Sequence, residues 1–326
     1  MTARRYRSIA ILSILLGLAA QSSSARADTD PEALVDALTA VFGKHDGKRA
    51  GHANGLCVKG SFAPTAEAAG LSKAPHLSGK GPWPVTGRFS MGGGNPAAPN
   101  TDKGNARGLA LHFDLGGGNV TDMVMISSPV FVAKSPEKFL DFLQRVASKD
   151  QARIDGFFEE NPESKTQGAW LKARPVPASC ATVSYFGVHT FTLTNAAGKR
   201  QIVKWRFVPK GGEVGLTDDE AKAKDPDFYR PELAERLAKG PAEFELTAIL
   251  GEPGDATDDP TALWPEERKS VKVGDLSIAA LENDATCDAG IFDPTNVVDG
   301  IAGPEHDGIF QLRSPAYAVS FSRRAQ

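Results

Sequence analysis

Alternating apolar and polar positions recur along the chain in short runs that have the length and period of half-buried β-strands. The predicted strands cover residues 56–62, 84–91, 108–115, 120–126, 182–195, 200–209 and 243–250. Ala196-Ala197-Gly198 joins two of these runs as a hairpin-like turn. Strands of this length, separated by Gly-rich turns, predict an antiparallel sheet or barrel.

Apolar residues at helical spacing predict a second set of elements. The predicted helices cover residues 31–43, 136–148, 218–223 and 231–239. Asp30 is a candidate N-cap with Pro31 at the first helical position, and Ser135 is the candidate N-cap of the second helix. The chain shows no internal repeat and no long linker. It is therefore predicted to hold a single α+β domain over residues 28–326, mainly a β-barrel with helices packed on it.

The first 27 residues have the three parts of a secretory signal peptide. Arg4, Arg5 and Arg7 precede an apolar run, and the segment ends in Ala25-Arg26-Ala27, an A-x-A cleavage pattern. The apolar run of about a dozen residues is too short to span a bilayer comfortably, which favours cleavage after Ala27 over a membrane anchor. Arg4-Arg5 could belong to a twin-arginine export signal, but the residues after this pair match that pattern poorly. An ordinary positively charged n-region is therefore favoured. We expect a periplasmic or secreted protein without stable membrane insertion.

Composition and charge narrow the classes of partner. The chain is 41% hydrophobic and 24% charged, which is typical of a globular protein with a sizeable core. Cleavage after Ala27 would remove four arginines and no acid, leaving 33 basic against 40 acidic residues and a net charge of −7. No basic excess points to nucleic acid, and no polybasic run points to a membrane surface.

The three cysteines are Cys57, Cys180 and Cys287, and their spacing fits no zinc or C-x-x-C pattern. An oxidising compartment would allow one disulfide, and three separately buried thiols are an equal alternative. Cys57 is interpreted as a small buried strand residue rather than a redox group. The histidines other than His52 show no ligand spacing and are interpreted as structural or exposed; they are His45, His76, His112, His189 and His306.

Four short motifs stand in a fixed order along the chain. They are Arg49-Ala50-Gly51-His52-Ala53-Asn54-Gly55, Arg88-Phe89-Ser90, Arg107-Gly108-Leu109-Ala110 and Arg313-Ser314-Pro315-Ala316-Tyr317. In this order they resemble the haem catalase family, whose patterns are R-x-x-H-A-x-G, R-F-S, R-G-x-A and R-x-x-x-Y. The resemblance continues through Asp259-Pro260-Thr261, Trp264-Pro265, Phe292-Asp293-Pro294 and Gly300-Ile301, so it covers roughly residues 40–324. Each motif is weak alone, and their common order makes the signal specific.

The resemblance implies an antiparallel β-barrel of catalase type, with surrounding helices and a buried haem b. The chain lacks the long N-terminal arm of full-length catalases, so it is most similar to compact, exported catalase-related peroxidases. We expect a monomer or a small homo-oligomer.

The resemblance makes His52 the distal acid/base. Cleavage of a peroxide O–O bond needs one group that takes a proton from the near oxygen and returns it to the departing oxygen. A neutral imidazole suits both steps at neutral pH. Ser90 matches the family serine that bonds to the other imidazole nitrogen and fixes its tautomer.

Tyr317 is implied to be the axial haem iron ligand, as a phenolate. An unperturbed tyrosine has a pKa of about 10, so ionisation needs help. Arg313 lies four residues earlier, one helical turn away on the same face, and its charge would favour the phenolate. Tyrosinate ligation is the catalase type of haem ligation.

Further family positions would hold the rest of the haem. Arg49, Arg88 and Arg324 match the arginines that pair with the propionates, which suits the bidentate guanidinium group. Phe139 matches the distal aromatic residue, although a helix core residue would look the same. Arg107 is interpreted as structural support.

One position departs from the family pattern. Where full-length catalases have N-x-T-P-x-F-F, this chain has Ile126-Ser127-Ser128-Pro129-Val130-Phe131, with Ile126 at the asparagine. The amide that would hold a second peroxide is lost, so disproportionation should suffer more than oxidation of small organic reductants. The sequence therefore predicts a peroxidase that acts on hydrogen peroxide or organic peroxides. The alternatives are a low-activity catalase, an enzyme that rearranges lipid hydroperoxides, and a haem-binding barrel without turnover.

Overall fold

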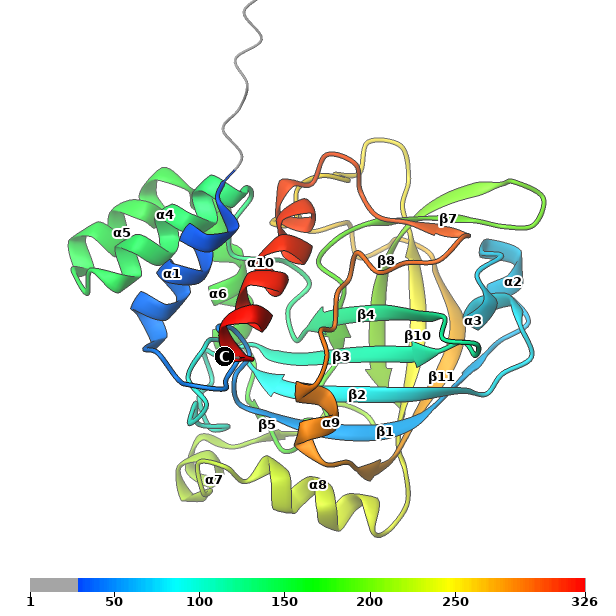
Figure 1. The fold of residues 1–326 in the computed structure, drawn as a ribbon, viewed down its shortest axis with the longest axis horizontal. Helices are drawn as coiled ribbons and strands as arrows, with labels where there is room; N and C mark the ends of the chain where they lie inside the picture. Colours follow the sequence, from blue (N-terminus) through cyan, green and yellow to red (C-terminus); the bar gives the residue numbers. More distant parts are fainter. Residues whose placement is uncertain (1–28, 326) are drawn as a thin grey trace, which may run out of the picture.

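The computed structural model describes residues 29–325, and Figure 1 shows that they form a β-barrel with helices outside it. The barrel strands are β1 (Gly55–Pro64), β2 (Trp83–Met91), β3 (Arg107–Asp114), β4 (Val120–Ile126), β6 (Tyr185–Phe186), β8 (Arg200–Pro209), β10 (Ala242–Leu250) and β11 (Ser270–Leu281). They are hydrogen-bonded in the order β10-β11-β1-β2-β3-β4-β6-β8, and β8 also pairs with β10. Eight antiparallel strands therefore close into a ring, which confirms the predicted barrel.

Short strands lie outside the ring. They are β7 (Phe191–Thr194) and β12 (Ile301–Ala302), which continue from β8, and β5 (Val176–Pro177) and β9 (Gly215–Leu216), which pair with each other. The barrel interior is filled with aromatic side chains. Phe62, Phe89, Phe113, Phe207 and Phe244 are each at most 1% exposed. Burial of each ring is worth about 1.5–3 kcal/mol, so the interior is a packed core and the site must lie on the outer face.

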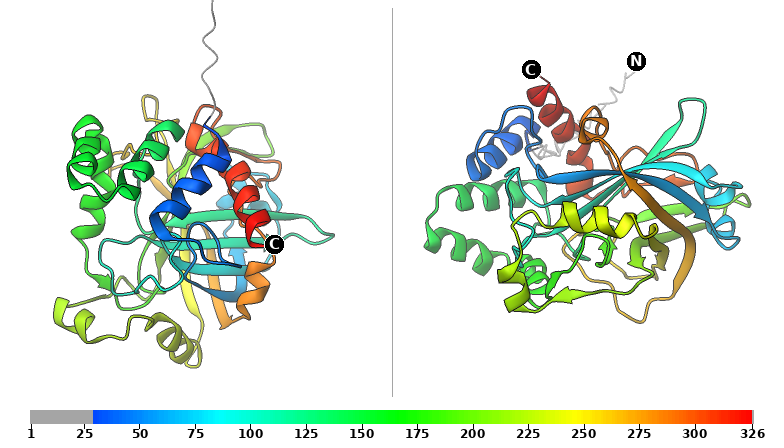
Figure 2. Two further views of the ribbon diagram at one scale, coloured as in Figure 1. Left: turned by 60° about the vertical axis from the view of Figure 1, so that its left-hand side comes forward. Right: turned by 90° about the horizontal axis from the view of Figure 1, so that it is seen from below.

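The helices are α1 (Pro31–Phe42), α2 (Ala68–Leu71), α3 (Pro75–Ser78), α4 (Pro136–Ala147), α5 (Gln151–Glu160), α6 (Lys165–Lys172), α7 (Asp218–Ala223), α8 (Tyr229–Leu237), α9 (Asp284–Asp288) and α10 (Gly308–Arg324). Asp30 and Ser135 cap α1 and α4 as predicted. Figures 1 and 2 show α1, α4 and α5 beside the barrel, with α10 next to α1. Leu34, Leu143 and Leu312 belong to the apolar cluster that joins α1, α4 and α10. This cluster fixes α10 relative to the barrel.

The prediction of one strand over residues 182–195 is wrong. Only β6 and β7 form there, because residues 187–190 leave the ladder. The His189 side chain in this break bonds to Asp307, and Thr190 donates to the carbonyl of Thr257. These side-chain contacts stabilise a bent path that strand periodicity does not reveal.

Two further predictions concern membrane insertion and export. No helix within residues 29–325 is both long and apolar enough to cross a bilayer. The predicted signal peptide lies outside the described residues.

Candidate active site

His52 lies in the loop between α1 and β1, in a backbone conformation that is rare for residues other than glycine. Its φ is 55°. Arg88 fixes this loop, because one of its terminal nitrogens donates to the carbonyl of His52 at 2.7 Å and the other to that of Ala53 at 3.1 Å. A strained residue that is held by a buried guanidinium group indicates a functional position.

Ser90 holds the His52 ring. The Nδ1 atom of His52 lies 3.0 Å from Oγ of Ser90. Gly108 pairs with Ser90 on the adjacent strand, and a Cβ atom there would lie 2.5 Å from Oγ of Ser90 and 2.9 Å from Nδ1 of His52. Glycine is therefore required for this contact. The His52–Ser90 pairing that the sequence predicted is present.

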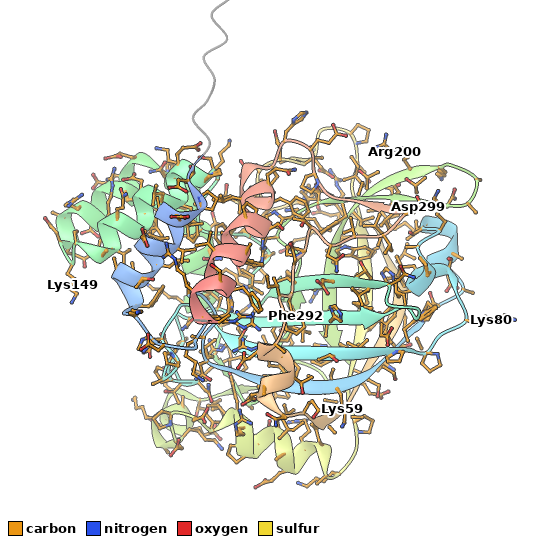
Figure 3. All side chains as sticks on the ribbon, in the orientation of Figure 1. Lys59, Lys80, Lys149, Arg200, Phe292 and Asp299 are labelled. Carbon is orange, nitrogen blue, oxygen red and sulfur yellow. A yellow bond between two sulfur atoms is a disulfide. The ribbon has the colours of Figure 1, made fainter. Side chains whose placement is uncertain are left out.

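Ile126 lies in the same row of the outer face. It pairs directly with Gly108 across β3 and β4. Directly opposed residues of an antiparallel pair point to the same face, so Ile126 borders the surface beside His52. The next row is Ala110 opposite Val124, and both residues pack against the cluster of Cys57, Cys287 and Phe292 (Figure 3 labels Phe292). The wall next to His52 is therefore apolar.

The surroundings of His52 favour a neutral imidazole. Burial, together with the positive charges of Arg88, Arg313 and Arg49, lowers the pKa of His52 to about 4. At neutral pH the ring is uncharged, which is the form that can accept a proton.

Tyr317 lies on α10 within a chain of hydrogen bonds. Arg313 donates to the phenolic oxygen of Tyr317 through Nε at 3.0 Å and Nη2 at 2.5 Å. Its Nη1 lies 3.1 Å from Nε2 of His189, and Nδ1 of His189 lies 2.6 Å from Asp307, the N-cap of α10. Burial lowers the pKa of His189, so a neutral ring can accept from Arg313 and donate to Asp307. The phenolic oxygen thus accepts two charge-assisted bonds.

Arg49 and Arg324 come together although 275 positions separate them in the sequence. Arg49 donates to the carbonyls of Cys287 at 2.6 Å and Gly290 at 3.2 Å. Arg324 donates to those of Asp288 at 3.2 Å and Gly290 at 2.7 Å. Burial, together with the charge of Arg49, lowers the pKa of Arg324 to about 10. Asp288 offsets part of the repulsion between these two partly buried guanidinium groups, and the remaining positive charge favours the binding of an anion here.

Arg88 adds to this positive charge. Burial lowers its pKa to about 10, with a further contribution from Arg49. Its terminal nitrogens are occupied by the His52 loop, so its predicted role toward a propionate stays a prediction. Arg107 is structural as predicted, since it bonds to Tyr229, Asn105 and Asn100.

Phe139 lies on α4 and is partly buried, with its ring centroid 4.9 Å from that of Phe131 in an edge contact. Both rings belong to the segment that follows Ile126. Phe139 also packs against the cluster of α1, α4 and α10, which agrees with a helix core residue, and its role beside a haem stays a prediction.

The residues present fit a haem group. A phenol within a positive network suits an axial ligand, an uncharged imidazole suits the opposite face, and the arginines suit two carboxylates. The described residues contain no group of three or more His, Cys, Asp or Glu side chains that would hold a bare metal ion.

Comparison with known proteins decides the family. The family model described as Catalase matches residues 32–325. The chain belongs to the catalase family. It is 38% identical over 332 residues to the catalase-related peroxidase of Synechococcus elongatus, covering 99% of this chain and 97% of that protein. It is 35% identical to the catalase-related peroxidase of Mycolicibacterium paratuberculosis, covering 90% and 94% respectively.

Solved structures agree on the fold. The structure of a bacterial catalase superposes with a TM-score of 0.75 at 25% identity, covering 86% of this chain and 58% of that one. The present member of the catalase family thus spans a little more than half the length of that catalase.

Sequence analysis missed part of the site. His189 was interpreted as structural or exposed, yet it bonds to Arg313, and neither its neighbours nor its spacing marks it. The carbonyls that hold Arg49 and Arg324 have no side-chain signature at all. The sequence left open one disulfide or three separate thiols. The structure has one disulfide, between Cys57 and Cys287, and Cys180 is a free buried thiol. Cys57 is buried as predicted, but as half of a cross-link.

Proposed function

We propose that this member of the catalase family is a haem-dependent peroxidase that reduces hydrogen peroxide or organic peroxides with small organic electron donors. Haem b would lie between His52 and Tyr317, with Phe139 beside it. Tyr317 would ligate the iron, and Arg49, Arg88 and Arg324 would face the propionates. Bound haem would supply the redox-active iron at which the O–O bond is broken. Support comes from the geometry above and from the two catalase-related peroxidases, which match over nearly their whole length.

His52 would move the proton. If Nδ1 of His52 donates to Oγ of Ser90, the free electron pair lies on Nε2. Nε2 then accepts the proton of the near peroxide oxygen and delivers it to the departing oxygen, which leaves as water or an alcohol. A pKa of about 4 keeps the imidazole ready to accept a proton at neutral pH. Ser90 and Gly108 act by positioning the ring.

Arg313 would hold Tyr317 in position. Its guanidinium group donates two hydrogen bonds to the phenolic oxygen, which fixes the direction of the ring. His189 and Asp307 hold the guanidinium group in place from the other side. These residues act through Tyr317 and are positioning residues.

The observation that favours a peroxidase over a catalase is the location of Ile126. It lies opposite Gly108 on the wall beside His52, where the family pattern has an amide. An apolar side chain cannot donate a hydrogen bond to a second peroxide molecule. Disproportionation needs that second peroxide, whereas oxidation of an organic donor does not.

One experiment separates the activities. The haem-loaded protein is given hydrogen peroxide with and without a phenolic donor, and oxygen release is recorded beside donor oxidation. We expect donor oxidation to dominate, and Ile126→Asn to raise oxygen release, while the control Ile202→Asn, a change at an exposed isoleucine, should leave it unchanged. Dominant oxygen release by the wild type would identify a catalase. Rearrangement of a fatty-acid hydroperoxide without a donor, or bound haem without turnover, would each contradict the peroxidase proposal.

We also propose that the protein works in the periplasm or outside the cell, after cleavage near Ala27. The Cys57–Cys287 disulfide supports this location, because such bonds persist in oxidising compartments. Mass spectrometry of the protein purified from the producing cell would test it, with Asp28 as the expected first residue.

A further inference from the structure

The segment 282–290, which contains α9, carries the backbone groups that hold two of the arginines. The carbonyls of Cys287, Asp288 and Gly290 accept every hydrogen bond described above for Arg49 and Arg324. The Asp288 carboxylate adds an ion pair with Nε of Arg49 at 3.6 Å. The direction of both guanidinium groups therefore depends on where this segment lies.

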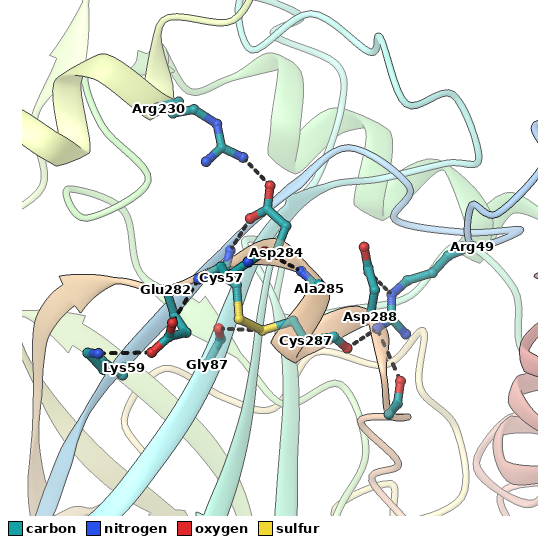
Figure 4. The surroundings of a disulfide bond; sticks show 12 residues. Arg49, Cys57, Lys59, Gly87, Arg230, Glu282, Asp284, Ala285, Cys287 and Asp288 are labelled. Atoms are coloured by element: carbon teal, nitrogen blue, oxygen red, sulfur yellow. Dashed lines mark hydrogen bonds and ion pairs between the residues drawn. A yellow bond between two sulfur atoms is a disulfide. The ribbon is translucent and has the colours of Figure 1, made fainter.

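The segment is tied to β1, the strand that leads out of the His52 loop (Figure 4). Polar ties lie at its start, where Glu282 donates to the carbonyl of Cys57 at 2.8 Å and Asp284 accepts from the backbone N–H of Cys57 at 3.0 Å. The covalent tie lies further along, at Cys287, which is also the residue whose carbonyl accepts from Arg49. The disulfide therefore anchors the segment at the residue whose carbonyl binds Arg49.

The location of the arginines makes this tie relevant to the site. The charge of Arg49 is near enough to act on both Tyr317 and His52, and it opposes the charge of Arg324. Two partly buried cations that repel each other tend to separate if the groups that hold them are free to move. Cys57 and Cys287 are only 1% and 2% exposed, and Sγ of Cys287 lies 3.2 Å from the carbonyl oxygen of Gly87 on β2. The disulfide is therefore buried against two barrel strands, β1 and β2.

We propose that the Cys57–Cys287 disulfide is a positioning element of the cofactor site, which holds Arg49 and Arg324 in the orientation that retains the haem carboxylates. The inference rests on the proposed binding of haem. It ties cofactor retention to an oxidising compartment. A dithiol reductant would transfer two electrons and two protons, convert the S–S bond into the two thiols of Cys57 and Cys287, and leave as its own disulfide. The freed segment would then hold both arginines less firmly.

The test compares the double variant Cys57→Ala/Cys287→Ala with the matched control Cys180→Ala, which removes a free buried thiol that belongs to another apolar cluster. Each haem-loaded protein is mixed with excess apomyoglobin at 25 °C, and haem transfer is followed by absorption. We expect the double variant to lose haem about tenfold faster, which corresponds to about 1.4 kcal/mol of lost binding free energy. The control should match the wild type.

A second readout uses the haem-free proteins. Hydrogen exchange should speed up in residues 282–290 and at the end of α10 in the double variant, while β10 stays protected. Wild-type protein that is reduced with a dithiol and alkylated under native conditions should show the same pattern. This sample replaces the double variant if that variant fails to fold. A lower melting temperature with unchanged haem loss and unchanged exchange in 282–290 would show that the bond only stabilises the fold. A wild type that takes up no haem would overturn the proposed function itself.

Discussion

Arg313 and Tyr317 lie one turn apart on α10, and two nitrogens of the guanidinium group converge on the phenolic oxygen at 3.0 and 2.5 Å. His189 and Asp307 fix the guanidinium group from behind. His52 is held separately, by Ser90 and Arg88. Each of the two groups expected to face the haem thus has its own support, and the supports come from different parts of the chain.

His52→Ala should bind haem and react slowly with peroxide. Loss of the proton acceptor removes a contribution of about 10²–10⁴-fold to the rate, while the phenol and the arginines remain. Stopped-flow absorption after peroxide addition measures the rate. His306→Gln alters an exposed histidine and should match the wild type. An unchanged rate in His52→Ala would remove His52 from the mechanism.

The reaction with peroxide should depend on pH through His52. The pKa of this residue is lowered to about 4, so the neutral ring predominates above that value and is lost as the pH falls through it. The rate should therefore be flat from pH 8 to pH 5.5 and fall by half near pH 4. Rapid mixing at each pH measures it. A rate that falls by half at about pH 6.5, the ordinary histidine pKa, would contradict the lowered pKa of the buried His52 ring.

Gly108→Ala should impair the reaction without removing a polar group. The added methyl would approach Ser90 and His52 to less than 3 Å, so one of them must move. Displacement of a catalytic group by a fraction of an ångström commonly costs about tenfold to a hundredfold in rate. Gly211→Ala is the matched control, because a Cβ atom there meets nothing within 4 Å. Equal rates in the two variants would show that the His52 ring is not held by this contact.

The stability of the haem-free protein should fall in mild acid because of His76. This residue is 0% exposed, and both ring nitrogens lack a hydrogen-bond partner among the described residues. Burial lowers its pKa to about 4. The folded state therefore binds a proton less readily than the unfolded state, so stability is complete above pH 6.5 and declines toward pH 4. The loss from His76 between pH 7 and pH 4.5 is about 2 kcal/mol.

Urea unfolding of wild type and His76→Phe at both pH values measures this loss. Phenylalanine suits the site because His76 already packs on the Phe113 ring at 5.1 Å. The variant should lose about 2 kcal/mol less than the wild type between the two pH values. An equal loss in both proteins would place the acid sensitivity elsewhere.

The sequence predicted the parts of the fold and site that local patterns encode. Strand alternation predicted most of the barrel, and the spacing of Arg313 and Tyr317 placed both on one helical face. β11 was missed because Gly274 and Asp275 interrupt its apolar alternation, and the helices α5, α6 and α10 were not predicted as elements. Periodicity identifies long regular segments and loses those with such interruptions.

Long-range partners explain what else was missed. His189 meets Asp307 across 118 positions and Arg313 across 124, so no local spacing reveals them. The partners of Arg49 and Arg324 are backbone carbonyls, which any residue provides. The pairing of Cys57 with Cys287 spans 230 positions and became evident only from the folded chain.

The absorption spectrum of the haem-loaded protein tests the central claim most directly, because it reports the axial ligand. We predict that wild-type protein binds one haem and gives the high-spin ferric spectrum of tyrosinate ligation, which Tyr317→Phe loses or changes strongly, while Tyr229→Phe, a substitution in the structural contact to Arg107, leaves it intact. A wild-type spectrum in the Tyr317→Phe variant would contradict the assignment of Tyr317 and the haem site built on it.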